Sequence, residues 1–149
     1  MGVSTDGILC FGIFFDEQHI FPWNKGDYHG DHEQWWRDNN DFNPSIKFDD
    51  CETDAQYDKF FDECRKWDKK HPCPFEPVNY CSNDCDMYIL IVPESQIVAS
   101  RGYPEKIKPE KLKVPEKKIK RLIDFCKKYK IRYTRKKTDP QWYLCSYWG

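Results

Sequence analysis

Three cysteines and a histidine in the middle of the chain have the side chains and the rough spacing of a zinc site. His71 is followed by Cys73, and Cys81 and Cys85 come later in the same connecting stretch. Structural zinc sites use more closely spaced cysteine pairs, which this set lacks. Reduced, metal-free thiols are therefore the favoured interpretation, with zinc and disulfides as the alternatives. Four other cysteines, Cys10, Cys64, Cys126 and Cys145, lie on predicted apolar surfaces and are expected to be buried core residues.

A pair of histidines, His29 and His32, stands among acidic residues in a polar stretch. Two imidazoles can bind a metal, or act as an acid and a base, when one element fixes both rings. A loop gives no such fixation, so a solvated loop is expected here. No glycine-rich phosphate loop, HExxH, GxSxG or kinase motif occurs in the chain. The sequence therefore predicts no catalytic residue, no metal and no cofactor.

The stretch from Asp16 to Asp50 is long and polar but rich in aromatic residues. A structureless loop of ~35 residues is uncommon, so this one is expected to pack through its rings or to bind a partner. Tryptophan is a frequent anchor of protein interfaces. Trp23, Trp35 and Trp36 are therefore predicted binding residues, and covering of an open sheet face is their alternative role.

A second predicted binding site lies at the ends of two strands. Asp6 precedes the first strand, and Arg101 and Tyr103 follow the third. If these ends meet, an ion pair between Asp6 and Arg101 is the structural interpretation. A small ligand pocket beside Tyr103 is the functional one.

The stretch from Lys106 to Lys137 holds fifteen lysines and arginines, with Tyr129 and Tyr133 among them. Phosphates attract such charge, and exposed rings can stack on bases, so nucleic-acid binding is one interpretation. The other is a solvated helix face that complements an acidic first half. Residues 1–95 carry 20 acids and 8 bases, whereas residues 96–149 carry 5 acids and 16 bases.

Two helices are predicted by apolar stripes at the helical period. The first begins at a capping box made by Thr53 and Gln56, and the second follows Pro115. Asp31 is expected to cap a further, short helix that carries Trp35 and Trp36. The two stripes consist of Tyr57, Phe60, Phe61, Cys64 and Trp67, and of Ile119, Leu122, Ile123, Cys126 and Tyr129.

Four short β-rich runs are predicted to be strands. Gly12, inside the first, indicates a bulge or a close backbone approach. The second and third are separated by a few turn residues and predict a hairpin. The runs are Ile8–Phe15, Met87–Val92, Ile97–Ala99 and Gln141–Trp148.

The order of these elements is β-α-β-β-α-β, which makes a ferredoxin-like arrangement possible. We expect one α+β domain over residues 1–149, with an about four-stranded mixed or antiparallel sheet and two helices on one face. The long aromatic-rich loop follows the first strand. One conflict remains, because the second strand is apolar on both faces yet would lie at a sheet edge.

The composition favours a soluble, cytoplasmic protein. Of 149 residues, 39% are hydrophobic and 33% are charged. No run approaches the roughly 18 apolar residues of a membrane span. The first residues lack the basic segment of a signal peptide. No membrane partner is therefore expected, and the oligomeric state is open.

Three stretches of the chain are distinctive: MGVSTDGILCFG at Met1–Gly12, the stretch from Cys81 to Pro104 that ends in SRGYP, and WYLCSYWG at Trp142–Gly149. Together they resemble a group of small uncharacterised proteins of tailed bacteriophages. The resemblance implies one complete domain made in the cytoplasm of an infected bacterium, and it carries no catalytic residue to transfer. Cys10, Cys85 and Cys145 depart from the pattern of that group, so the resemblance does not support cysteine chemistry.

Three functions are compatible with these observations. The first is a non-catalytic phage accessory protein that binds and modulates a host protein, for instance as an anti-defence inhibitor. The second is a nucleic-acid-binding accessory protein that uses the basic second half. The third is a small enzyme that binds a nucleotide or metabolite near Asp6, Arg101 and Tyr103. The first is favoured because the sequence has many aromatic residues and no catalytic constellation.

Overall fold

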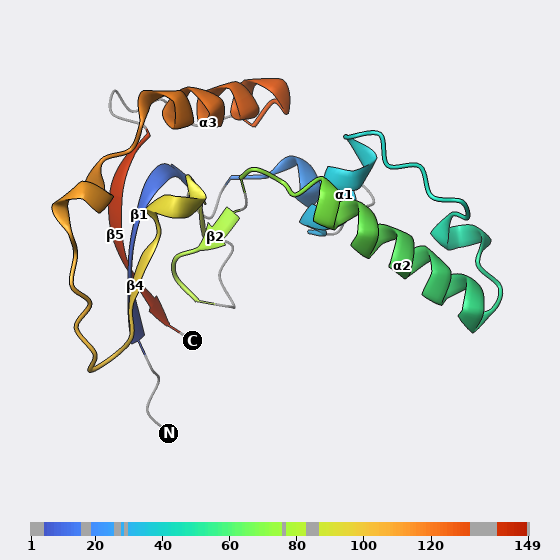
Figure 1. The fold of residues 1–149 in the computed structure, drawn as a ribbon, viewed down its shortest axis with the longest axis horizontal. Coiled ribbons are helices and arrows are strands. Elements are labelled where there is room, and N and C mark those ends of the chain that lie inside the picture. The colour runs from blue at the N-terminus through green and yellow to red at the C-terminus, as the bar shows by residue number, and fades with distance from the viewer. Residues whose placement is uncertain are drawn as a thin grey trace. The chain divides into compact units, whose positions relative to one another are not determined.

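The computed structural model describes residues 5–15, 19–25, 28, 30–75, 77–82, 87–131 and 140–148. The chain groups into two compact units. We call Met1–Phe21 with Phe75–Gly149 the sheet unit, and Pro22–Pro74 the helical unit (Figure 1). Helices and an antiparallel sheet together make this an α+β protein, as predicted. That the whole chain forms one domain, with both predicted helices on one face of the sheet, stays a prediction.

The sheet is built around the first strand, β1 (Thr5–Phe15). One edge of β1 pairs with β5 (Gln141–Trp148) from Thr5↔Trp148 to Gly12↔Gln141. The other edge pairs with β4 (Ile97–Ala99) and β3 (Tyr88–Ile91), and β2 (Pro77–Asn79) pairs with β3. Every pairing between these strands is antiparallel. The structure thus adds one short strand, β2, to the four that were predicted.

The predicted hairpin of residues 87–99 is wrong. Strands β3 and β4 both pair with β1, one after the other along the same edge, instead of pairing with each other. Between the pairs Gly12↔Ile91 and Leu9↔Ile97, β1 advances three residues while the opposite chain advances six. The 3-10 turn η4 (Pro93–Ser95) takes up the excess as a bulge.

This bulge also resolves the conflict over the apolar second strand. Because β3 and β4 form one interrupted strand, the short β2 is the outer neighbour of β3. Ile89 and Leu90 of β3 point to opposite faces of the sheet and are both fully buried, so both faces of this strand are covered. Counting β3 and β4 as one, the strand order β5-β1-β3-β2 is that of the split βαβ pattern, although the ferredoxin-like topology itself stays a prediction.

Ser95 fills the gap in the ladder that the bulge leaves. Its hydroxyl accepts a hydrogen bond from the backbone N–H of Phe11 (2.9 Å) and lies 2.6 Å from the carbonyl oxygen of Val92, to which it donates. The side chain is 4% exposed. We expect Ser95→Ala to lower the free energy of unfolding by about 1–3 kcal/mol, because the buried Phe11 N–H loses its partner. Urea unfolding at neutral pH measures this loss, and a change below about 0.5 kcal/mol would contradict the role given to the hydroxyl.

Both predicted long helices form. Helix α2 (Asp54–Lys70), in the helical unit, begins at the predicted capping box of Thr53 and Gln56. Helix α3 (Glu116–Lys128), in the sheet unit, buries Leu122, Phe125 and Cys126. The predicted stripe of α3 missed Phe125, whose ring meets that of Phe75 at a centroid distance of 5.2 Å. No helix among the described ranges is long and apolar enough to cross a membrane.

The helical unit also contains the predicted short helix, α1 (His32–Asp38). Asp31 caps it by accepting a hydrogen bond from the backbone N–H of Gln34 (2.8 Å). Among its described residues this unit also has the 3-10 turns η1 (Pro22–Asn24), before α1, and η3 (Phe48–Asp50), before α2. In the sheet unit, the 3-10 turn η5 (Pro109–Leu112) precedes α3.

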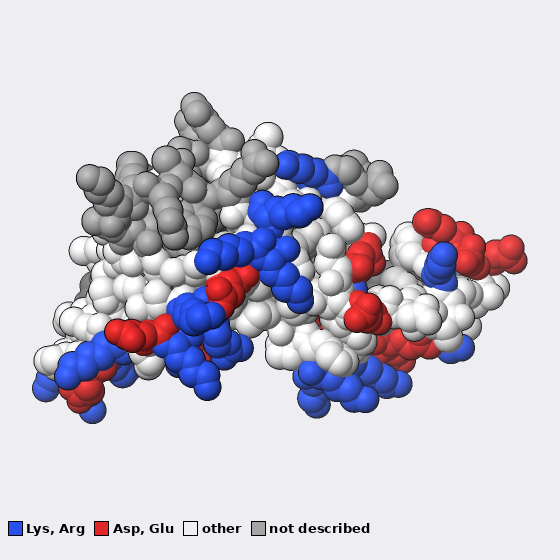
Figure 2. Space-filling view, turned by 90° about the horizontal axis from the view of Figure 1, so that it is seen from above, with Lys and Arg blue, Asp and Glu red and all other residues white. Residues whose placement is uncertain are grey.

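Charge is divided between the two units. By sequence, the helical unit has 13 acids and 8 bases, a balance of −5, and the sheet unit has 12 acids and 16 bases, a balance of +4. Figure 2 shows lysines and arginines gathered on the face of the sheet unit that carries α3. Described residues 101–130 contribute twelve of these bases against four acids.

Candidate binding site

The structure places two of the three predicted tryptophan anchors inside the helical unit. Trp23 and Trp35 are each 3% exposed, and their ring centroids lie 4.9 Å apart. Both rings therefore belong to the core of this unit, whereas the sequence predicted them as binding residues. Trp36 is half-buried, and its Nε1 donates to the carbonyl oxygen of His71 (2.8 Å).

His32 belongs to the same core. Its ring lies 4.6 Å from that of Trp23 and 5.6 Å from that of Trp35. Burial lowers the pKa of His32 to about 4, against the opposing effect of the Asp31 carboxylate. The imidazole is thus neutral at pH 7. Its Nε2 lies 3.8 Å from the Cys73 sulfur, but a neutral ring does not provide the positive charge that stabilises a thiolate.

This histidine gives the helical unit a specific pH dependence. In the unfolded chain His32 takes up a proton near pH 6.5, whereas in the folded unit it does so only near pH 4. The unfolded state therefore binds more protons between these values, and stability is lost as the pH falls from about 6.5 towards about 4. We expect His32→Phe to flatten this part of the stability profile. Thermal unfolding of both proteins across that range tests it, and equal slopes would contradict the assignment.

The possible zinc set does not come together among the described residues. No group of three histidine, cysteine or acidic side chains in the described ranges is close enough to hold a metal ion. Cys73 lies beside His32, and the His71 ring stacks on Trp67 at 4.6 Å, with its Nδ1 3.1 Å from the Trp67 carbonyl oxygen. The seven described cysteines form no disulfide with one another, while Cys85 and also His29 lie outside the described residues.

Four cysteines predicted to be core residues have the environment of inert thiols. Burial raises the pKa of Cys10, helped by Cys145, and that of Cys126, each to about 12. Burial also raises the pKa of Cys64 and of Cys145. A raised pKa leaves little of the nucleophilic thiolate at pH 7.

Asp6 and Arg101 meet at the end of the sheet. Asp6 Oδ1 accepts a hydrogen bond from the backbone N–H of Arg101 at 3.2 Å, so the main chain makes this contact. Tyr103, two residues further on, is 78% exposed. A ligand-binding role for these three residues stays a prediction.

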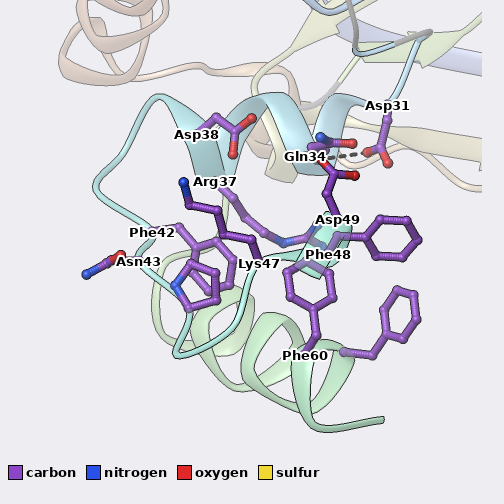
Figure 3. A pocket seen from close by; sticks show the side chains of 12 residues that line it. Asp31, Gln34, Arg37, Asp38, Phe42, Asn43, Lys47, Phe48, Asp49 and Phe60 are labelled. Carbon is purple, nitrogen blue, oxygen red and sulfur yellow. Dashed lines mark hydrogen bonds between the residues drawn. The ribbon is translucent and has the colours of Figure 1, made fainter. Parts of the chain in front are cut away.

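The helical unit contains a pocket that the sequence did not predict (Figure 3). It has a volume of about 580 Å³, within the range of small-ligand and peptide-anchor sites. Its walls come from α1, from the loop that follows α1, and from α2. The lining residues are Asp31, Gln34, Arg37, Asp38, Phe42, Asn43, Pro44, Lys47, Phe48, Asp49, Phe60 and Phe61.

Arg37 fixes the α1 wall of the pocket to α2. Its Nε and Nη2 donate to the two carboxylate oxygens of Asp68 at 2.9 and 2.7 Å, and Nη2 also donates to Glu33 at 3.1 Å. Burial acts to lower the pKa of Arg37, but the hydrogen bond and the charge of Asp68 outweigh it and raise the pKa. The guanidinium is thus permanently charged and already engaged, which suits a structural clamp.

The loop between α1 and α2 is held against α2 in two ways. Ser45 donates to the Glu63 carboxylate through its backbone N–H (2.7 Å) and through its hydroxyl (2.6 Å). Phe42 meets the rings of Trp67 and Phe60 at centroid distances of 5.5 and 6.5 Å. This part of the predicted binding loop is therefore ordered by its own aromatic and polar contacts.

Phenylalanines form the apolar side of the pocket. Phe48 meets the rings of Tyr57, Phe60 and Phe61 at centroid distances from 5.3 to 6.0 Å. Phe48 and Phe61 are nevertheless 49% and 45% exposed. Two large rings held in place yet half open to water are a ready contact surface for another apolar group.

The polar side of the pocket is predominantly acidic. Asp31, Asp38 and Asp49 line it, against the cations Arg37 and Lys47. Burial raises the pKa of Asp38 despite the opposing charge of Arg37, and the charge of Asp31 adds to this effect. Because Arg37 is already paired with Asp68 and Glu33, Lys47 is the lining cation whose ammonium makes no ion pair with another described residue. An apolar group that carries a positive charge fits this combination best.

No protein-family model, no curated protein and no solved structure matches the chain significantly. The fold and the pocket therefore define the class of protein by themselves: an α+β protein whose helical unit carries an open, acidic and phenylalanine-lined pocket.

Proposed function

We propose that the protein is a non-catalytic accessory protein that binds a host protein through the phenylalanine-lined pocket of the helical unit. The observation that carries the proposal is the half-exposure of Phe48 and Phe61 beside three pocket carboxylates. The predicted role of aromatic interface anchors thus passes from Trp23 and Trp35 to these phenylalanines. The partner presents an apolar side chain next to a lysine or arginine.

A protein segment fits the pocket better than a small metabolite does. Sites for small ligands bury most of the ligand surface. Here two of the four phenylalanines are about half exposed, so one side of the pocket is open to a larger surface. A side chain inserted from a partner would cover both rings and exclude water, as anchors at interface hot spots do.

Catalysis has little support in this unit. Arg37 is already paired with Asp68 and Glu33. Burial raises the pKa of Asp38, but no nucleophile lies beside this carboxylate among the residues that line the pocket. His32 is neutral at pH 7 and lies within the tryptophan core. These features favour recognition over chemistry.

The resemblance to tailed-phage proteins gives the proposal its biological setting. It implies synthesis in the cytoplasm of an infected bacterium, where host proteins are available as partners. Inhibition of a defence protein is one form that such modulation takes.

Capture from host lysate with matched variants tests the proposal. We expect the double variant Phe48→Ala, Phe61→Ala to capture at least about tenfold less of the partner than the wild type does. The reason is that aromatic anchors at hot spots contribute roughly 2 kcal/mol or more each. The control is Ile107→Ala, Leu112→Ala, which removes two comparably exposed apolar side chains of the sheet unit. The proposal fails if both double variants capture the same proteins as the wild type while their circular-dichroism spectra are unchanged.

Nucleic-acid binding is a second candidate, favoured by the twelve bases of residues 101–130 (Figure 2). Lys127 is exposed on α3, and Lys128 stacks over the ring of Tyr129 at 4.8 Å. Binding of this kind should weaken by orders of magnitude between roughly 50 and 200 mM salt, because bound phosphates release counterions. Nuclease treatment of the lysate separates the candidates, since a protein partner of the pocket survives it.

A further inference from the structure

The outer edge of β5 carries unpaired backbone groups. The inner edge pairs with β1 along all eight residues. On the outer edge the N–H of Trp148 donates to the carbonyl oxygen of Cys81 at 2.7 Å. Because alternate residues of an antiparallel strand direct both backbone groups to the same edge, Trp142, Leu144 and Ser146 also point outward. No described backbone group bonds to these three outward positions.

Apart from the contact of Trp148 with Cys81, strand β5 lacks the features of sequence and geometry by which proteins protect an edge. Such protection comes from charged side chains, proline, bulges or a short strand. Gln141–Trp148 is eight residues long and contains neither a charged residue nor a proline. Its pairing with β1 runs without a bulge from one end to the other.

Two apolar side chains on one face of β5 are also exposed to solvent. Leu144 is 80% exposed and Trp148 is 55% exposed. These values contrast with the buried Cys10 and Ile8 on the opposite face of β1, which pair with Tyr143 and Cys145. An unpaired edge and an uncovered apolar side chain thus coincide at Leu144.

We propose that a second copy of this chain pairs with β5 along this edge, antiparallel and about a two-fold axis at Leu144. Trp148 is already bonded to Cys81, so the open part of the edge runs from Trp142 to Ser146, and Leu144 is its centre. Pairing about this centre places Trp142 opposite Ser146 of the second copy and Leu144 opposite its own copy. It forms about six backbone hydrogen bonds and joins the two sheets.

The chemistry of β5 favours its own copy as the occupant. A charged edge strand opposes like charges when it pairs with itself, and this costs free energy. Strand β5 has no charge, so self-pairing meets no such repulsion, and it brings the most exposed leucine of the sheet against another leucine. The surface lies in the sheet unit and is independent of the pocket proposed for the host protein.

Proline at position 146 tests the pairing without disturbing the rest of the sheet. The N–H of Ser146 points to the outer edge, so Ser146→Pro removes an intermolecular donor and leaves the β1 ladder complete. Ser146→Ala is the matched control, because it keeps the N–H. Leu144→Lys is a second variant, which places like charges opposite each other on a side chain too exposed to affect folding.

Sedimentation velocity over a concentration series gives the readout. We expect the wild type and Ser146→Ala to dimerise, and the dissociation constant of Ser146→Pro and Leu144→Lys to rise at least tenfold. Amide exchange at Leu144 and Ser146 should slow as the wild-type concentration rises. A wild type that stays monomeric, or dimers that persist unchanged in both Leu144→Lys and Ser146→Pro, would overturn the proposal.

Discussion

Replacing Gly12 with alanine is expected to prevent the sheet unit from folding normally. A Cβ atom at this position would lie 2.3 Å from the carbonyl oxygen of Leu90 and 2.9 Å from the Cα of Ile91. Both are backbone atoms of the neighbouring strand, so no side chain can rotate away to make room. Overpacking of a core typically costs 1–3 kcal/mol, and a clash with backbone should reach or exceed the upper value, roughly 3 kcal/mol.

Gly7 provides the matched control on the same strand. A Cβ there meets only Ala99, at the ordinary distance of 3.9 Å. Gly7→Ala should therefore leave the free energy of unfolding within about 1 kcal/mol of the wild type. Urea unfolding of both variants decides the matter. Similar midpoints for the two would show that β1 and β3 do not approach each other as closely as the structure has them.

Removal of Trp35 should have an effect of similar size on the helical unit. The side chain is 3% exposed and lies among Trp23, His32 and Trp36. Truncating a buried tryptophan to alanine costs about 3–5 kcal/mol, because the cavity is only partly refilled. Trp36→Ala should cost markedly less, since that side chain is only half-buried, although it loses the hydrogen bond to His71.

Intrinsic fluorescence and near-ultraviolet circular dichroism during thermal unfolding compare these two neighbours. We expect Trp35→Ala to lower the melting temperature much more than Trp36→Ala. If Trp35→Ala melts like the wild type, the tryptophan cluster is not the core of the unit.

Local sequence signals predicted the elements well. The capping box of Thr53 and Gln56 and the cap of Asp31 act over three residues, so they are legible in the sequence, and the helices begin where they indicate. The termini of the predicted strands were also close to those of β1 and β5. Gly12 was interpreted as a bulge or a close approach, and it is a close approach.

Tertiary arrangement was harder to predict. The segment from Pro93 to Ser95 has turn residues that suit a hairpin, but Ser95 instead bonds to Phe11, which is 84 residues away in the chain. The burial of Trp23 depends on contacts with α1, and no local period marks it. The pocket could not be predicted either, because its walls are brought together by the pairing of Arg37 with Asp68, 31 residues apart.

Site-specific photo-crosslinking can locate the surface of the protein that binds the host protein. A benzophenone amino acid at position 48 would stand at the open side of the pocket, and the same group at position 107 would stand on an exposed part of the sheet unit. In host cells we expect position 48 to form a covalent adduct with one host protein, and we expect Lys47→Glu in the same chain not to diminish it. Position 107 should give no such adduct. Equal labelling from both positions, or an adduct from position 107 alone, would contradict a binding site at the phenylalanine-lined pocket.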